Sequence, residues 1–493
     1  MTQSYQGVVY EKVGDDYFAK RRLARYAGVF SLWALGVGAV ISGHFSGWNL
    51  GLAYGWGAMF VATIIVTVMY VGLAFSLAEM SPAMPHAGGA YSFARSAMGP
   101  WGGFVTGIAQ TIEYVLTPAV VVFFIGLYLG AVMETGPEHQ PLYWLAVYAV
   151  FVAANMFGVE LSFRLTALVT LIALGCLLFF FLLALPNFDF AQWALNIDTG
   201  PDGVLVYLPG GGGPRFPAGV DGVLAALPFA VWLYLAIEQV PLAAEETRDP
   251  RSDLPIGILL GTLTLIVSAF AVVVLNASLA PGSFGLKGSG GPLLDGYRAL
   301  FGPDIAQNLA WVAIAGLAAT LHAVIYACGR QIFALSRAGY YPRGLSLTHR
   351  TSHAPQIALL TGAGIGLGVM LVLWFAYGPQ KGAALIGGAL LNMAVFAAMI
   401  SYVLQAVSFI LLRINMPLIE RPFRSPLGIP GAAMTLVIAL LTLYVQGRSP
   451  EFLEPMLLVG ATYVLMLLYF AVYGRTQLVL SPEEEFAISE GRT

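Results

Sequence analysis

The sequence predicts an all-α polytopic membrane protein with twelve transmembrane helices. Of its 493 residues, 58% are hydrophobic and only 10% are charged, whereas a soluble chain carries roughly 25% charged residues. Apolar runs of about the 20 residues needed to cross a bilayer occur twelve times. These runs are continuous rather than alternating, which argues against a transmembrane β-barrel. The bilayer is therefore the first predicted partner.

The twelve predicted spans are separated mostly by short connections. They cover residues 29–54, 57–80, 101–133, 141–157, 163–186, 222–244, 254–280, 304–337, 355–378, 382–412, 430–447 and 452–473. Several exceed the length that a straight crossing requires, which is typical of tilted or interrupted helices.

The positions of lysine and arginine predict the orientation, because cytoplasmic connections carry an excess of both. With the amino terminus inside, all but five of the 23 basic residues fall on the cytoplasmic side; the five are Arg215, Lys287, Arg298, Lys381 and Arg448. Both termini are therefore predicted to be cytoplasmic. The first 27 residues are polar and lack a short apolar core, so we expect no cleavable signal peptide.

Several function classes lack support in the sequence. Cys176 and Cys328 both lie in apolar runs, where buried packing explains them better than a disulfide or a metal cluster. The glycine-rich stretch "LPGGGGPRFPAG" lacks the lysine and the following helix of a P-loop. No HExxH, GxSxG or paired-cysteine motif and no basic patch occurs. We therefore expect no enzyme activity, no cofactor, no metal and no nucleic-acid partner.

The first span contains an interruption, "VISGHFSGWN" (Val40–Asn49), in which six of ten residues are Gly, Ser, His or Asn. Irregular backbone at membrane depth is tolerated only where it lines a cavity or is buried in protein. Transporters place such breaks in corresponding spans of two inverted halves, around the substrate site. Five spans later, "LPFAVWLYLAIEQVPLAAEE" carries Pro228, Pro241 and an acid, Glu238. The alternative is that the glycines form a packing face and the prolines only kink a helix.

This pairing predicts two five-span repeats with two spans appended. The chain then divides into an amino-terminal cytoplasmic tail (1–28), a first repeat (29–186), an extracellular loop (187–221), a second repeat (222–413), the two appended spans (414–474) and a carboxyl-terminal cytoplasmic tail (475–493).

Four stretches carry a resemblance to a known family. "VISGHFSGWNLGLAYG", "PHAGGAYSFARSAMGPWGGFVTGIAQTIEYV", "AAEETRDPRSDLPIG" and "GRQIFALSRAGYYP" resemble the amino acid–polyamine–organocation permease superfamily. Within it, the ISGxxxGWN and AQxIEY stretches most resemble the bacterial ethanolamine permeases. The resemblance implies a LeuT-like fold, with spans 1–5 and 6–10 as inverted repeats and spans 1 and 6 unwound. It also implies the bacterial cytoplasmic (inner) membrane as the location.

The resemblance assigns the unwound segments to particular residues. The first-span motif falls on Ile41, Ser42 and Gly43, and the sixth-span segment falls on Tyr234 to Ala236, where the family usually has a glycine at the last position. Two departures concern coupling. The lysine that many proton-coupled relatives carry in the fifth span is replaced by Ala173, and the eighth span offers Thr320 alone where a sodium site takes adjacent hydroxyls.

Two acids within spans are candidate substrate-binding residues, because an ionisable residue at membrane depth usually marks a site. Glu113 lies in the third span near Gln110, with no basic residue close in sequence. A primary ammonium would supply the missing cation; the alternative is a hydrogen bond between helices. Glu238 lies two residues after the expected break. Its predicted role is contact with the substrate or with a proton. The alternatives are pairing with His44 or with backbone amides, and a purely structural role.

Three ring-bearing residues complete the predicted site. Trp232 and Tyr234 offer aromatic faces to a cation, or they pack. His44 either titrates near physiological pH or caps the broken helix. His44, Glu113 and Glu238 are the proton-coupling candidates.

A charged run follows the sixth span and is a candidate cytoplasmic gate. The run contains Glu245, Glu246, Arg248, Asp249 and Arg251, and its predicted partners in a gate of ion pairs are Glu79, Arg95, Arg330 and Arg337. The alternative is a solvated loop, since surface ion pairs stabilise little.

The predicted function is secondary uptake of ethanolamine or a similar small amino alcohol by alternating access, with protons as the candidate coupling ion in a symporter. The first-span break would receive the hydroxyl end, and Glu113 would hold the amine. The alternatives are an amino acid or polyamine permease or exchanger of the same superfamily, and a transporter-like amine sensor. Homo-oligomer formation is left open.

Overall fold

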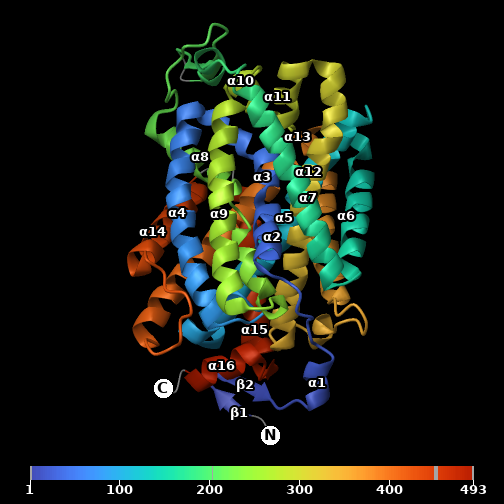
Figure 1. Ribbon diagram of the computed structural model, residues 1–493, viewed down its shortest axis with the longest axis vertical. Coiled ribbons are helices and arrows are strands. Elements are labelled where there is room, and N and C mark those ends of the chain that lie inside the picture. The colour runs from blue at the N-terminus through green and yellow to red at the C-terminus, as the bar shows by residue number, and fades with distance from the viewer. Residues whose placement is uncertain (1–2, 202–203, 449–452, 491–493) are drawn as a thin grey trace.

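Both ends of the chain lie at the same end of a bundle of long helices (Figure 1). The computed structural model describes residues 3–201, 204–448 and 453–490. The ends of the two predicted tails (1–2 and 491–493), residues 202–203 of the predicted loop 187–221 and residues 449–452 before the last span lie outside the described residues. We call the end that holds both termini the terminal face and the opposite end the loop face.

Long helices make up most of the chain. In order they are α2 (Val29–Val40) with its continuations α3 (Ser42–Phe45) and η1 (Trp48–Tyr54), α4 (Trp56–Ala83), α5 (Ala90–Val132), α6 (Gln140–Met156), α7 (Val159–Ala184), α8 (Gly219–Trp232) with its continuation η4 (Ile237–Glu246), α9 (Pro250–Leu275), α12 (Pro303–Arg337), α13 (Gln356–Asn415), α14 (Gly428–Arg448) and α15 (Leu453–Val472). Among the candidate spans, α5 has the most deeply buried membrane-length window.

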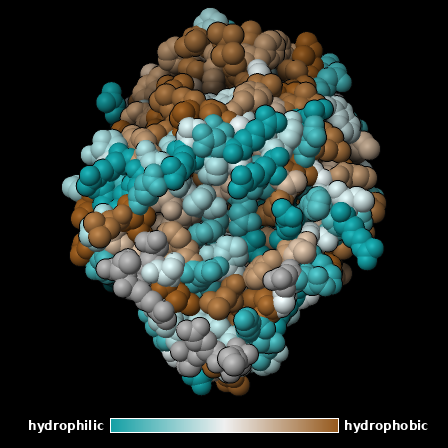
Figure 2. All heavy atoms as spheres, turned by 60° about the horizontal axis from the view of Figure 1, so that its bottom comes forward, coloured by the Kyte–Doolittle hydropathy of each residue, from teal (hydrophilic) through white to brown (hydrophobic). Residues whose placement is uncertain are grey.

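Shorter elements cover the two ends of the bundle. They are β1 (Gln3–Tyr5), β2 (Val8–Glu11), α1 (Asp15–Ala19), η2 (Pro137–His139), η3 (Phe190–Ala194), β3 (Ile197–Thr199), β4 (Leu205–Tyr207), α10 (Gly282–Leu286), α11 (Pro292–Phe301), η5 (Arg343–Ser346), η7 (Gly474–Thr476), β5 (Leu478–Val479) and α16 (Pro482–Glu490). At the terminal face, β2 pairs antiparallel with β1 and parallel with β5, which joins the two tails in one sheet. Figure 2 shows hydrophilic residues gathered across this face.

Glycine–proline pairs interrupt two of the long helices at predicted span boundaries. Gly99 (φ 77°, ψ −174°) is non-helical, so Pro100 begins a second helical segment of α5 next to the predicted span start at 101, and the segment that begins at Ala90 precedes it. Gly378 (φ 75°) and Pro379 likewise turn the chain within α13, which contains both predicted spans 355–378 and 382–412. Glycine supplies the positive φ, and proline cannot donate the helical hydrogen bond.

Fewer helices than the twelve predicted spans meet the criteria of length and apolar composition for crossing a membrane. Among the described residues, nine helices are long and apolar enough to cross a membrane, or ten if the bent pair Val29–Phe45 and Trp48–Tyr54 forms one span. The predicted span 141–157 corresponds to α6, whose 17 residues fall short of a 20-residue crossing. A count of twelve stays a prediction, whereas a polytopic helical membrane architecture is confirmed.

The first predicted break is real but differs in position. Ile41 has helical angles (φ −59°, ψ −23°), whereas the chain leaves the helix at Ser46 (φ −160°, ψ 155°) and Gly47 (φ 94°), just after the expected Ile41–His44 segment. The Thr320 hydroxyl explains the difference. It accepts from the Ser42 amide at 2.8 Å and donates to the Gly38 carbonyl at 2.7 Å. A side chain inserted into the helical ladder replaces one backbone bond and keeps the backbone near helical.

The second predicted break lies where the sequence places it. Helix α8 ends at Trp232, and Ala236 adopts a left-handed conformation (φ 85°) before the 3₁₀ helix η4. Alanine therefore takes the conformation usually left to glycine, at a cost of roughly 1–2 kcal/mol. The Ala236 amide donates to the Glu238 carboxyl group at 3.1 Å, which helps to hold this strained turn.

The two breaks touch each other directly. A Cβ atom placed on Gly43 would lie 2.3 Å from the Trp232 carbonyl oxygen. The indole N–H of Trp232 donates to the Ser46 carbonyl at 3.0 Å. The interrupted segments of α2–η1 and α8–η4 therefore form one continuous contact inside the bundle.

We predict that Gly43→Ala weakens this contact. The added methyl group would meet backbone rather than a flexible side chain, and overpacking costs about 1–3 kcal/mol. Thermal unfolding of the detergent-solubilised protein should show this loss. Gly364→Ala is the matched control, because Gly364 is an exposed helical position with nothing within 4 Å of an added Cβ. Equal melting temperatures for wild type and Gly43→Ala would contradict the close contact.

Candidate functional site

Two buried carboxyl groups lie side by side in the interior of the bundle. Glu113 comes from the middle of α5 and Glu238 from the first turn of η4, directly after the second break. Glu113 is fully buried, Glu238 is 1% exposed, and their carboxyl groups face each other. The structure thus brings together the two acids that the sequence predicts as site residues.

The surroundings of Glu238 supply hydrogen-bond donors. Its Oε2 accepts from the Ala236 amide at 3.1 Å and from the Tyr402 hydroxyl of α13 at 2.7 Å. Its Oε1 accepts a longer bond, 3.5 Å, from the Tyr114 hydroxyl of α5. Donors of this kind favour the charged form of a carboxyl group. Glu238 is therefore the member of the pair to which the protein supplies hydrogen-bond donors.

The surroundings of Glu113 supply none. Neither carboxyl oxygen has a hydrogen-bond donor among the described residues, and no described lysine or arginine forms an ion pair with either acid. A buried charge without a partner is strongly unfavourable. This arrangement therefore requires a positive partner at Glu113, either a proton or the cationic group of a ligand.

Aromatic hydroxyl groups surround the pair. Tyr70 of α4 lies 3.1 Å from the Tyr402 hydroxyl, and its ring lies 5.1 Å from that of Tyr234. Tyr234 also bonds to Thr67 at 2.7 Å. Gln110 donates to Tyr114 at 3.3 Å, while its carbonyl oxygen has no partner in the described structure. Ring faces and a free amide oxygen suit the binding of a small cation.

His44 and Trp232 belong to the contact between the breaks rather than to the acid pair. His44 is fully buried; its Nε2 bonds to the Leu233 carbonyl and its Nδ1 to Ser268 of α9, both at 3.1 Å. Since a carbonyl only accepts, Nε2 carries a proton and donates to Leu233. His44 thus joins the first break to the second and does not pair with Glu238. Of its two predicted roles, the geometry favours the structural one.

Sequence reasoning missed several partners. Tyr402, Tyr70, Ser268 and Thr67 lie in apolar runs as single polar groups, and Thr320 was considered only for sodium. Their spacing along the sequence does not show which of them reach the site: a serine or threonine hydroxyl in a helix can bond to its own backbone, and a tyrosine can simply pack. Only the three-dimensional contact with the breaks distinguishes them.

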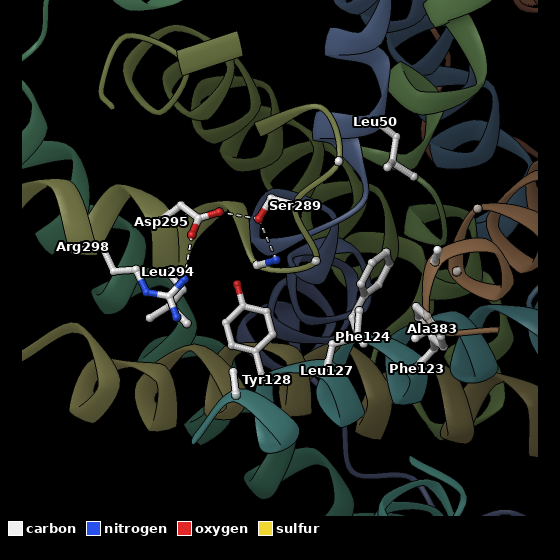
Figure 3. Close-up of a pocket in the computed structure, with 17 residues that line it drawn as sticks. Leu50, Phe123, Phe124, Leu127, Tyr128, Ser289, Leu294, Asp295, Arg298 and Ala383 are labelled. Atoms are coloured by element: carbon white, nitrogen blue, oxygen red, sulfur yellow. Dashed lines mark hydrogen bonds and ion pairs between the residues drawn. The ribbon is translucent and has the colours of Figure 1, made fainter. Parts of the chain in front are cut away.

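A pocket of about 540 Å³ lies on the loop side of the first break. Figure 3 shows Phe123, Phe124 and Leu127 on one side of it and the ion pair Asp295–Arg298, 2.8 Å apart, on the other. The Tyr128 hydroxyl in its wall donates to the Phe45 carbonyl at 3.3 Å, at the end of α3. None of the predicted site residues lines this pocket.

The predicted gate residues form several ion pairs near the terminal face. Arg330 pairs with Glu246 at 2.6 Å, and Arg337 pairs with Glu245 at 2.5 Å. Arg95 pairs at 2.5 Å with Glu484, in the carboxyl-terminal helix α16. Sequence reasoning missed this acid, because nothing in the sequence of the tail shows that it packs against α5.

Glu79 does not belong to this group, contrary to the prediction. It pairs instead with Arg413, at the end of α13, and with Arg421, 3.0 Å away in the connection to α14. The last turn of α4 points this carboxyl group toward the appended helices, where it also accepts from the Ser425 amide at 2.7 Å.

Comparison with known proteins supports a membrane carrier. The model of a family described as amino acid permease matches residues 28–473. An uncharacterized transporter from Rhizobium meliloti is 27% identical over 432 residues, covering 86% of both chains. The branched-chain amino acid permease BcaP of Bacillus subtilis is 25% identical over 86% of this chain and 88% of its own. A methylthioribose transporter of the same organism is 24% identical over 82% and 85%.

We predict that Tyr402→Phe lowers the free energy of unfolding by roughly 1–3 kcal/mol, because a buried carboxylate loses a donor. Thermal unfolding in detergent measures the change. Tyr148→Phe is the matched control, since the buried Tyr148 hydroxyl has no partner among the described residues. A Tyr402→Phe protein as stable as the Tyr148→Phe protein would show that this donor does not support Glu238.

Proposed function

Because the chain belongs to the amino acid permease family, within the amino acid–polyamine–organocation superfamily, we propose that it carries a small amine, ethanolamine or a similar amino alcohol, across the membrane by alternating access. The chain is a multi-pass membrane transporter and not an enzyme. The finer parts of the proposal concern the substrate, the coupling ion and the orientation.

The observation that carries the proposal is the pair Glu113 and Glu238. One carboxyl group has its donors and the other has none, and both are buried. A primary ammonium group brings three N–H donors and one positive charge. It therefore supplies Glu113 with donors and places one positive charge between the two carboxyl groups.

Two backbone amides at the breaks already donate hydrogen bonds within the protein, which favours a substrate without a carboxylate. A substrate carboxylate would use the free N–H groups and the positive end of a half-helix. Here the Ser42 amide already donates to Thr320, and the Ala236 amide already donates to Glu238. An amino alcohol needs neither group, since its hydroxyl can bond to a carbonyl or to a tyrosine.

A second candidate is an amino acid permease, and the relatives favour it. The family is described as amino acid permease, and BcaP is named a branched-chain amino acid permease. A methylthioribose transporter is nevertheless similar to the chain over most of its length. Overall similarity at this level therefore does not determine the substrate, and the local chemistry at Glu113 is what supports the amino alcohol.

Protons are the proposed coupling ion, in agreement with the requirement for a positive partner at Glu113. When the ammonium leaves, a proton takes its place, so the empty site keeps one positive charge between the two acids. The proton then moves opposite to the amine, as in an antiporter rather than in the symporter that the sequence predicts. The Thr320 hydroxyl is engaged on both sides by the first break, which removes it from a sodium site. We assign the terminal face to the cytoplasm from the excess of basic residues there, and the location to the bacterial inner membrane.

Uptake of labelled ethanolamine into proteoliposomes tests the proposal. We expect saturable uptake that responds to an imposed pH gradient and not to a sodium gradient. Glu113→Gln should abolish uptake while keeping the melting temperature, since glutamine preserves the shape and can donate to Glu238. Glu160→Gln, at an exposed carboxyl group at the start of α7, is the control and should transport like wild type.

Two results would contradict this assignment. Branched-chain amino acids that compete fully with ethanolamine, or that alone are taken up, would favour the amino acid permease. Ethanolamine binding without counterflow in sealed vesicles would indicate a sensor rather than a carrier.

A further inference from the structure

The carboxyl-terminal segment Gln477–Glu490 crosses the terminal face beneath the bundle, where Figure 1 shows α16 below α15. Strand β5 pairs with β2 of the amino-terminal tail, and the Val479 amide donates to the Ala338 carbonyl at 2.9 Å, just past the end of α12. We call this segment the latch. The latch is hydrogen-bonded to the amino-terminal tail and to the end of α12.

Glu484 is the main anchor of the latch. It is fully buried and accepts from Arg95 at 2.5 Å and from three tyrosine hydroxyls, those of Tyr10 (2.6 Å), Tyr340 (2.9 Å) and Tyr91 (3.0 Å). Burial, together with the Glu484 carboxylate, raises the pKa of Tyr10 and of Tyr340. Both hydroxyls therefore stay protonated and continue to donate across the physiological pH range.

Glu483 connects the latch to the second broken helix. It pairs at 2.6 Å with Arg337 of α12, which also pairs at 2.5 Å with Glu245 near the end of η4. Glu245 in turn accepts from the Ala87 amide at 3.1 Å, in the turn between α4 and α5. The two adjacent acids thus join α5, α12 and η4 through buried, charge-assisted bonds.

These three elements surround the route from the acid pair to the terminal face. Glu113 lies on α5 and Glu238 at the start of η4, so a substrate leaving toward this face must pass between those elements. Alternating access requires them to separate there. While the latch is in place, separation would leave buried arginines without partners, which is strongly unfavourable.

We propose that the latch supplies the acidic half of the terminal-face gate, with Glu484 and Glu483 holding the gate closed and leaving their arginine partners when it opens. The inference rests on the proposed carrier function, because it assigns a gate to the same pathway. It makes Glu484 a positioning residue that acts through Arg95 and sets the rate of opening toward the cytoplasm.

Cysteine accessibility tests the latch without any substrate. Ala87 is fully buried at the gate, so Ala87→Cys reports on opening, and Cys176 and Cys328, both buried, are replaced by alanine. The rate of labelling by a maleimide is measured on the full-length protein in detergent. We expect Glu484→Gln to raise the rate by at least about tenfold, since a bond to a charged group is lost.

Glu485→Gln is the matched control, because Glu485 is the exposed neighbour of Glu484 on the same helix. It should label like the parent. Tyr340→Phe removes one donor and keeps the ring, so it should label at an intermediate rate; it replaces Glu484→Gln in the comparison if that variant unfolds. Parental rates in both test variants, or the same increase in Glu485→Gln, would overturn the proposal. The labelling experiment uses no substrate, so its outcomes do not depend on ethanolamine uptake. If ethanolamine is not taken up, only the proposed substrate is contradicted.

Discussion

Two buried carboxyl groups without a cationic side chain from the described residues are the constraint on which the rest of this structure depends. Burial withholds the solvation that would relieve such a pair, since Glu113 is fully buried and Glu238 is 1% exposed. The protein supports one acid, Glu238, with a backbone amide and tyrosine hydroxyls, and gives the other, Glu113, no donor among the described residues. Because Glu113 lacks the donors that Glu238 has, the site needs a positive group next to Glu113, and this group can be exchanged between a proton and a ligand.

The break in the second interrupted helix places Glu238 next to Glu113 in the interior of the bundle. The left-handed turn at Ala236 starts η4, and the amide of that turn bonds to Glu238. His44 and Trp232 then fasten the second break to the first. The left-handed turn at Ala236, the buried Glu238 and the contact between the two breaks are therefore coupled. We expect a change in any one of them to move the acid pair.

Sequence patterns predicted the parts of this arrangement that carry their own signal. Glycine, serine and proline in apolar runs indicated both breaks, and isolated acids indicated Glu113 and Glu238. The exact backbone departure at Ser46–Gly47 was not predictable, because it depends on Thr320, distant in sequence, filling a gap in the helical ladder. The partners of Arg95 and Glu79, which are Glu484 and Arg413, were not predictable for the same reason: charge spacing along a chain does not reveal which helix end lies nearby. The span count, the inverted repeat and the roles of the site residues stay predictions.

The most direct measurement of the central claim is proton release on binding. Calorimetric titration of the detergent-solubilised protein with ethanolamine, in two buffers of different ionisation enthalpy, gives the number of protons exchanged. If an ammonium group replaces the proton at Glu113, binding releases about one proton, and Glu113→Gln releases none. Binding without proton release in the wild type would contradict the account.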